Sequence, residues 1–116
     1  MTEQESAHER LAAERADTLA RLGGLERELA GTIESSGAAG TDDEHDPEGP
    51  TIAFERQHVA ALLGQARQQL AEIDAALRRV AAGSYGRCDK CGQPIGTDRL
   101  AARPALATCV GCASRR

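Results

Sequence analysis

Two cysteine pairs near the end of the chain constrain its fold more than any other feature. Cys88 and Cys91 form one Cys-x2-Cys pair, and Cys109 and Cys112 form a second pair after 17 intervening residues. Pairs at this separation are typical of a zinc site, because each Cys-x2-Cys turn presents two sulfurs to one ion and Zn²⁺ is readily held by four thiolates in a tetrahedron. With all four positions filled by protein ligands, the spacing predicts one structural zinc ion.

Two other uses of these cysteines stay open from spacing alone: two disulfides, or a redox-active Cys-x2-Cys pair. Disulfides belong mainly to oxidising compartments. The chain starts with the polar sequence MTEQESAHER, which does not resemble a signal peptide. No stretch approaches the roughly 20 apolar residues that a membrane span needs. We therefore expect a cytoplasmic protein without a membrane partner, and zinc is the favoured interpretation.

The segment around the cysteines, residues 83–116, predicts a small module that needs its metal to fold. Its sizeable apolar residues are Tyr85, Ile95, Leu100, Leu106 and Val110. So few apolar groups cannot fold the module alone, and metal binding is expected to contribute on the order of 10 kcal/mol. Gly92 and Gly111 lie beside the cysteines, where tight turns need a permissive backbone. We recognise no nucleophile–base pair and no open metal position, so we do not expect an enzyme.

Residues 51–82 predict a long amphipathic helix. Its apolar residues keep a strict 4-3 spacing over three heptads, at Val59, Leu63, Ala66, Leu70, Ile73, Leu77 and Val80. This spacing is typical of a coiled-coil seam. Pro50 suits the first turn of such a helix, and Gly83 suits the position just after its end.

Residues 3–34 predict a second, weaker helix. Its apolar stripe wavers between spacings of 3 and 4, at Ala12, Ala16, Leu19, Leu22, Leu25, Leu29 and Ile33. We expect a bend or soft spot at Gly23-Gly24, since each glycine costs about 1 kcal/mol relative to alanine inside a helix. An acidic loop, residues 35–50, connects the two helices.

The fold that follows is mainly α: an antiparallel two-helix coiled-coil hairpin over residues 1–82 and a small C-terminal four-cysteine zinc finger over residues 83–116. Phe54 and Tyr85 are the only aromatic residues, which argues against a large globular core. We expect Phe54 to anchor the second helix against the first. We expect a monomer, and pairing of the first helix with another chain is the alternative.

The chain is acidic at its front and basic at its end. Residues 1–50 hold 13 acids and 4 arginines (–9), and residues 51–116 hold 10 bases and 5 acids (+5), which together give the net charge of –4. Five of the acids lie in TDDEHDPEGP, residues 41–50. This stretch is either a solvated linker, a metal site with His45, or an acidic tip presented to a partner.

The segment GSYGRCDKCGQPIGTDRLAARPALATCVGC resembles the zinc finger of the DksA/TraR family of bacterial transcription factors. The matching features are the cysteine pairs, the Gly83-x-Tyr85-Gly86 turn and the Arg99-Leu100-x-Ala102-Arg103-Pro104 run. The resemblance implies a coiled-coil hairpin attached to a zinc-bearing end. It also implies binding to RNA polymerase rather than DNA, with the hairpin in the secondary channel and its acidic tip near the catalytic centre, where it regulates transcription.

The resemblance also suggests which residues contact the partner. The tip pattern D-x-x-D-x-A of the family is matched most nearly by Asp43, Asp46 and Glu48, with Glu48 in the alanine position. Members often act with the alarmone ppGpp and commonly have a further helix after the last cysteine. This chain stops at ASRR, so ppGpp is kept only as an open alternative.

The basic residues of the finger, Arg87, Lys90, Arg99 and Arg103, are candidates for binding the polymerase. The alternative is that Arg99 and Arg103 pair with Asp89 and Asp98 and brace the finger. Two other functions stay open: a DNA-binding finger, whose cysteine spacing is also found in GATA-type modules, and a structural or storage protein with a passive zinc site. A finger of net charge +4 with no following recognition helix does not favour DNA binding.

Overall fold

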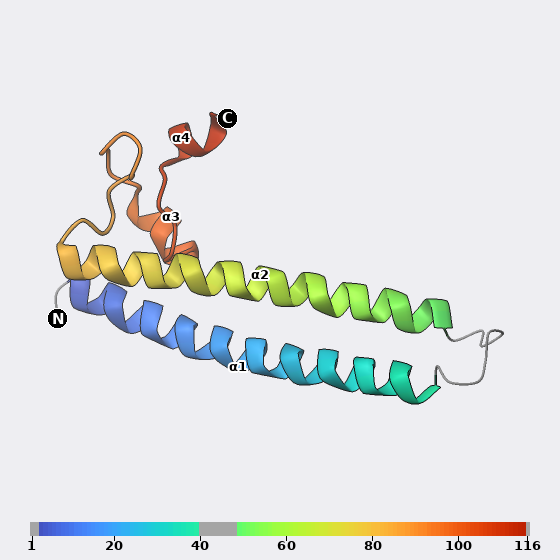
Figure 1. Ribbon diagram of the computed structural model, residues 1–116. Helices are drawn as coiled ribbons and strands as arrows, with labels where there is room; N and C mark the ends of the chain where they lie inside the picture. Colours follow the sequence, from blue (N-terminus) through green and yellow to red (C-terminus); the bar gives the residue numbers. More distant parts are fainter. Residues whose placement is uncertain (1–2, 40–48, 116) are drawn as a thin grey trace. The chain divides into compact units, whose positions relative to one another are not determined.

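The computed structural model describes residues 3–39 and 49–115 (Figure 1). Its helices are α1 (Glu3–Ala39), α2 (Gly49–Ala82), α3 (Thr97–Ala102) and α4 (Val110–Ser114). Within these residues the one β-type pairing is an isolated bridge between Arg87 and Pro94. The chain is therefore mainly α, as predicted, with α1 and α2 packed against each other as a hairpin. In the described part of the chain, no helix combines the length and apolar character of a membrane span.

The long helices differ from the prediction mainly at the connecting loop. Helix α1 continues to Ala39, five residues past the predicted end, and α2 begins at Gly49. Ser35, Ser36 and Gly37 are poor helix formers, but each costs no more than about 1 kcal/mol, so the helix can extend through them. Helix α1 is continuous through Gly23 and Gly24, so the two glycines do not end it, and a bend or soft spot at this place stays a prediction.

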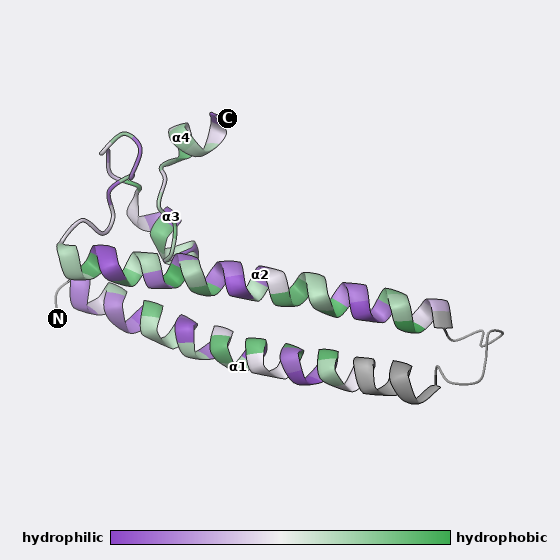
Figure 2. Cartoon of the chain, in the orientation of Figure 1, coloured by the Kyte–Doolittle hydropathy of each residue, from purple (hydrophilic) through white to green (hydrophobic). Residues whose placement is uncertain are grey.

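Backbone proximity divides the chain into two compact units, one of which is Thr18–Gln68. In this unit α1 and α2 share a cluster of buried residues, Leu25, Val59, Leu63 and Ala66, with Leu22, Leu29 and Leu62 packed around it. The three α2 residues among the buried ones are the predicted seam positions. Apolar and polar residues alternate along both helices, as this one-sided packing requires (Figure 2).

The other unit contains Met1–Asp17 together with Gln69–Arg116, so the first turns of α1, the last turns of α2 and the finger belong together. Leu11, Ile73 and Ala76 are fully buried between the two helices. Around them, Arg15 Nε lies 2.6 Å from Asp74 Oδ1, and Gln69 Nε2 donates to Glu14 Oε1 at 3.2 Å. The ion pair is more than a third exposed, so the buried aliphatic residues contribute most to this packing.

The predicted stripe on α1 is wrong in its first half. Ala12, Ala16 and Leu19 are exposed, whereas Ala7, Leu11 and Thr18 are buried. The buried face keeps a spacing of 3 to 4 residues through position 18, where the sequence has threonine in place of an aliphatic residue. The prediction assigned Leu19 to the apolar stripe because leucine is more hydrophobic than threonine. It is Thr18, however, that lies on the face of α1 that packs on α2.

Phe54 is not a packing anchor. Its side chain is 75% exposed, although it lies on the α2 stretch that carries the buried Val59. Position 54 is five residues before Val59, and five residues turn a helix by about 140° away from the seam. The expectation that the only phenylalanine of the chain would be buried took account of its hydrophobicity and not of its position on the helix.

Candidate metal centre

The zinc finger has a core of three buried residues, one of which is a cysteine. Cys88, Ile95 and Leu100 are 3%, 6% and 8% exposed, and Tyr85 and Leu106 pack against them. Val110, predicted as part of the apolar content of this module, is instead 61% exposed. An aliphatic core this small supports the prediction that the module depends on its metal.

The first cysteine pair lies on a tight turn. The backbone N–H of Cys88 donates to the Gln93 carbonyl at 2.8 Å, and the N–H of Gly92 donates back to the Cys88 carbonyl at 2.9 Å. Gly92 has φ of 79°, in the left-handed region where glycine is favoured, as expected for a turn of this kind. This turn holds the Cys91 side chain on the same side as the Cys88 side chain.

The second pair lies on the start of a helix. Cys109 is the N-cap of α4, and its Sγ accepts the backbone N–H of Cys112 at 3.4 Å. Gly111 lies inside α4 and has no positive φ, so the expectation that it needs a permissive backbone is wrong. A helix start brings residues three apart to one face, which is how the Cys109 and Cys112 sulfurs come together.

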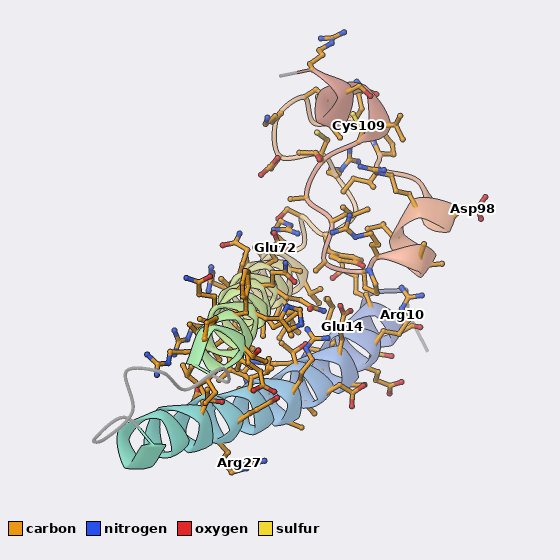
Figure 3. The ribbon with its side chains drawn as sticks, turned by 90° about the vertical axis from the view of Figure 1, so that its right-hand side faces the viewer. Arg10, Glu14, Arg27, Glu72, Asp98 and Cys109 are labelled. Atoms are coloured by element: carbon orange, nitrogen blue, oxygen red, sulfur yellow. The ribbon has the colours of Figure 1, made fainter. Side chains whose placement is uncertain are left out.

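The sulfurs of the four cysteines form one cluster, and Figure 3 labels one of these residues, Cys109. The four sulfurs all lie within 4.8 Å of one another, Cys91 Sγ and Cys109 Sγ are 3.7 Å apart, and all four cysteines are free of disulfides. A tetrahedral Zn²⁺ with Zn–S distances of 2.3 Å separates its sulfurs by about 3.8 Å. The cluster therefore fits one structural zinc held by Cys88, Cys91, Cys109 and Cys112. Within the described residues, no second group of His, Cys, Asp or Glu gathers in this way.

The lowered pKa values of two of the cysteines are consistent with a cation bound at the sulfur cluster. Backbone hydrogen bonds, the largest from Cys109, lower the pKa of Cys88 to about 6. The pKa of Cys109 is also lowered, chiefly by its bond from the Cys112 backbone. Hydrogen bonds to the Cys91, Cys88 and Cys109 side chains raise the pKa of Cys112 to about 12. The hydrogen bonds thus lower the pKa of Cys88 and of Cys109 and raise the pKa of Cys112, and a divalent cation bound at the cluster would favour the deprotonated form of its ligands.

The finger joins the last turn of α2 through a helix cap and a tyrosine. Gly83 donates its backbone N–H to Val80 and Ser84 donates to Arg79, which is the hydrogen-bond pattern of a Schellman cap. Gly83 has φ of 79°, as its predicted place after the helix requires. Tyr85 O–H donates to the Pro104 carbonyl at 2.8 Å, and burial raises the pKa of this phenol, which keeps it protonated as the donor.

The four basic candidates of the finger have different surroundings. Arg87 donates to the Gly92 carbonyl at 3.3 Å, and Arg99 donates from Nε to the Thr108 carbonyl at 3.2 Å. Arg99 thus braces the finger through a carbonyl oxygen, and the side chain of Asp98 points outward (Figure 3). Lys90 and Arg103 are exposed. Polymerase binding by these four residues stays a prediction.

The acidic tip residues Asp43, Asp46 and Glu48, and His45 with them, lie outside the described residues. Another residue of interest was not singled out from the sequence. Arg79 donates to two carbonyl oxygens of the finger, which lie 26 and 27 positions later in the chain. An arginine in the last turn of a helix is common, so nothing in the local sequence marks this long-range contact.

Comparisons with known proteins agree with this geometry. Residues 83–116 match the model of the prokaryotic dksA/traR C4-type zinc finger. The RNA polymerase-binding transcription factor DksA of Caulobacter vibrioides is 49% identical over 49 residues, which cover 42% of this chain and 34% of that protein. DksA of Haemophilus influenzae is 39% identical over 46 residues, 40% of this chain and 32% of that protein. The matched segments thus span about a third of the length of these curated relatives.

The similarity of folds extends further along the chain. The structure of transcription factor DksA2 from Pseudomonas aeruginosa matches with a TM-score of 0.79 and 29% sequence identity, covering 97% of this chain and 81% of that one. The finger match, the DksA relatives and this whole-chain likeness agree with one another. Residues 83–116 are therefore a zinc finger of the dksA/traR C4 type, and the chain as a whole is similar in fold to DksA2.

Proposed function

We propose that this chain is a bacterial transcription regulator that binds RNA polymerase through its secondary channel. The observation that carries the proposal is the likeness to DksA2 over 97% of the chain, which includes the paired helices as well as the finger. The curated relatives that share the finger are RNA polymerase-binding transcription factors. In this proposal the zinc is structural, and the chain acts by binding.

The order of elements supports a role for the acidic loop. The loop connects the end of α1 at Ala39 to the start of α2 at Gly49, whereas the finger follows the end of α2 at Ala82. We propose that Asp43, Asp46 and Glu48 form the tip that faces the catalytic centre of the polymerase. The domain boundary that we propose, at residues 82 and 83, separates this hairpin from the finger.

The finger would then contribute to the grip on the enzyme. Lys90 and Arg103 offer exposed positive charge, whereas Arg87 and Arg99 already donate to carbonyl oxygens. Charged groups at the rim of an interface mainly affect the rate of association and its dependence on salt.

The proposal is tested by binding to purified core RNA polymerase. Immobilised protein should retain the core enzyme, and a known secondary-channel ligand in excess should release it. Duplex DNA in a parallel assay should show no binding at moderate salt. Failure to retain the core enzyme would refute the proposal. Specific duplex binding that weakens steeply with salt would favour the DNA-binding alternative.

A further inference from the structure

Residues 104–108, which we call the strap, lead directly into the zinc ligand Cys109. Each of the five successive strap carbonyls accepts a hydrogen bond from outside the strap. The bonds are Tyr85 O–H to Pro104 (2.8 Å), Arg79 to Ala105 (3.5 Å) and Leu106 (3.3 Å), Asp89 N–H to Ala107 (2.8 Å) and Arg99 Nε to Thr108 (3.2 Å). A segment with every carbonyl bound has little freedom to shift without breaking several bonds.

The donors connect the strap to both of its neighbours. Arg79 belongs to the last turn of α2, whereas Asp89 lies between the zinc ligands Cys88 and Cys91. Through these bonds the strap is fixed to the helix pair at one end and to the metal centre at the other. Both neighbours and the strap lie in the same compact unit.

The side chains of the strap also contact both the helix pair and the finger. Ala105 packs against the cluster of Leu11, Ile73 and Ala76 between α1 and α2. Leu106, the next residue, packs against the core of the finger. Tyr85 packs against both clusters. The two small cores are thus contiguous through the strap and Tyr85. Because each core has only three buried residues, we expect the stability of each to depend on the other.

Arg79 has the central place in this connection. Its carbonyl accepts the Ser84 N–H at 2.9 Å in the cap of α2, and its guanidinium reaches the Ala105 and Leu106 carbonyls. Its Nε is buried and has no partner within the described residues. A partly desolvated guanidinium makes stronger bonds to carbonyls than an exposed one does, which offsets the length of these two bonds.

We propose that Arg79, acting through the strap, couples zinc binding at the four cysteines to the packing of α1 on α2. When zinc holds Cys109, the strap is fixed and presents its carbonyls to Arg79 and the Ala105 side chain to the helix cluster. When zinc is lost, the strap is released and the first turns of α1 lose part of their support. Because such coupling is reciprocal, the helix pair also strengthens the binding of zinc.

The test compares Arg79→Gln with Arg78→Gln in the full-length protein. Arg78 is the exposed neighbour, so this control removes the same charge without touching the strap. Zinc affinity is measured by competition with a chelator of known affinity. Arg79→Gln should bind zinc about tenfold more weakly than the control, because the lost bonds together correspond to about one charge-assisted hydrogen bond. If Arg79→Gln does not fold, Arg79→Lys, which keeps the charge but not the planar fork, takes its place.

Hydrogen exchange gives a readout on the helix side. In the wild-type protein, removal of zinc should raise the exchange rate of the backbone amides around Leu11. In Arg79→Gln, removal of zinc should raise this rate by less than it does in the wild-type protein. Equal zinc affinity of the two variants within about twofold would overturn the proposal. Exchange around Leu11 that does not respond to zinc in the wild-type protein would overturn it as well.

Discussion

Cys91→Ser should yield a protein without stoichiometric zinc and with an unfolded finger. The structural zinc of such modules contributes on the order of 10 kcal/mol, while the buried core of the finger consists of Cys88, Ile95 and Leu100. Three buried residues contribute much less than the metal does. The finger should therefore lose its fold, while the cluster around Leu25 and Leu63 in the other unit should keep its packing.

Cys91 is the best position for this test because its side chain is exposed. Replacing the buried Cys88 would disturb the core as well as the zinc, so the two effects would not be separable. Metal content should fall from one zinc per chain in the wild-type protein to less than one in the variant. Tyr85 is the only tyrosine and the chain has no tryptophan, so its fluorescence reports the finger directly.

A matched control is Val110→Ser, which also introduces a hydroxyl into the finger. Val110 is 61% exposed and is not a zinc ligand, so this variant should keep its zinc and its Tyr85 fluorescence. Retention of one tightly bound zinc by Cys91→Ser would contradict the four-cysteine site. A folded finger in metal-free wild-type protein would show that the core is sufficient without the ion.

The double substitution Asp43→Asn, Asp46→Asn should abolish the effect on transcription while preserving binding to the polymerase. Asparagine has nearly the shape of aspartate, so the variant removes two negative charges with little change in volume. If the tip acts on the catalytic centre through its charge, the transcriptional effect should fall by at least about tenfold. Binding should stay within about threefold, because in the proposed complex the finger and the paired helices also contact the polymerase.

Asp42→Asn with Glu44→Gln is the matched control for the tip. These residues lie in the same loop and remove the same charge, but they fall outside the D-x-x-D pattern. The control should keep most of the transcriptional effect. An equal loss in both double variants would mean that the total charge of the loop matters and not its pattern. Unchanged transcription in Asp43→Asn, Asp46→Asn would reduce the loop to a linker.

The sequence predicted α2 and the metal centre well, for physical reasons that are local. Apolar residues hold every seam position of α2 from Val59 to Val80, so no other register would bury them together. The cysteine spacing determines which four sulfurs can meet. Their cluster within 4.8 Å confirms that prediction without reference to any other part of the chain.

Helix α1 shows what periodicity cannot resolve. Its buried face includes Thr18, 2% exposed, while the neighbouring Leu19 is 40% exposed. A prediction that places the more apolar of two neighbouring residues in the interior is therefore wrong for Thr18 and Leu19. The partner helix decides the register of α1, and that information is not in the local sequence.

The strap is a second feature that the sequence alone does not reveal. Arg79 and the carbonyls of Ala105 and Leu106 are far apart in the chain. The contacts use backbone oxygens, which every residue has, so no motif in the strap marks them. Only the three-dimensional arrangement of the finger on the end of α2 shows that Arg79 donates hydrogen bonds to both of these carbonyls.

In the proposed complex, the acidic tip lies near the catalytic centre of RNA polymerase. A photo-crosslinking amino acid at position 48 tests this placement, with the same group at the exposed finger position 110 as a reference. In the complex with core enzyme, position 48 should crosslink to the segments that line the polymerase active centre, and a secondary-channel ligand in excess should abolish the product. Crosslinks from position 48 only to the outer surface of the enzyme, in a complex that still forms, would contradict this placement.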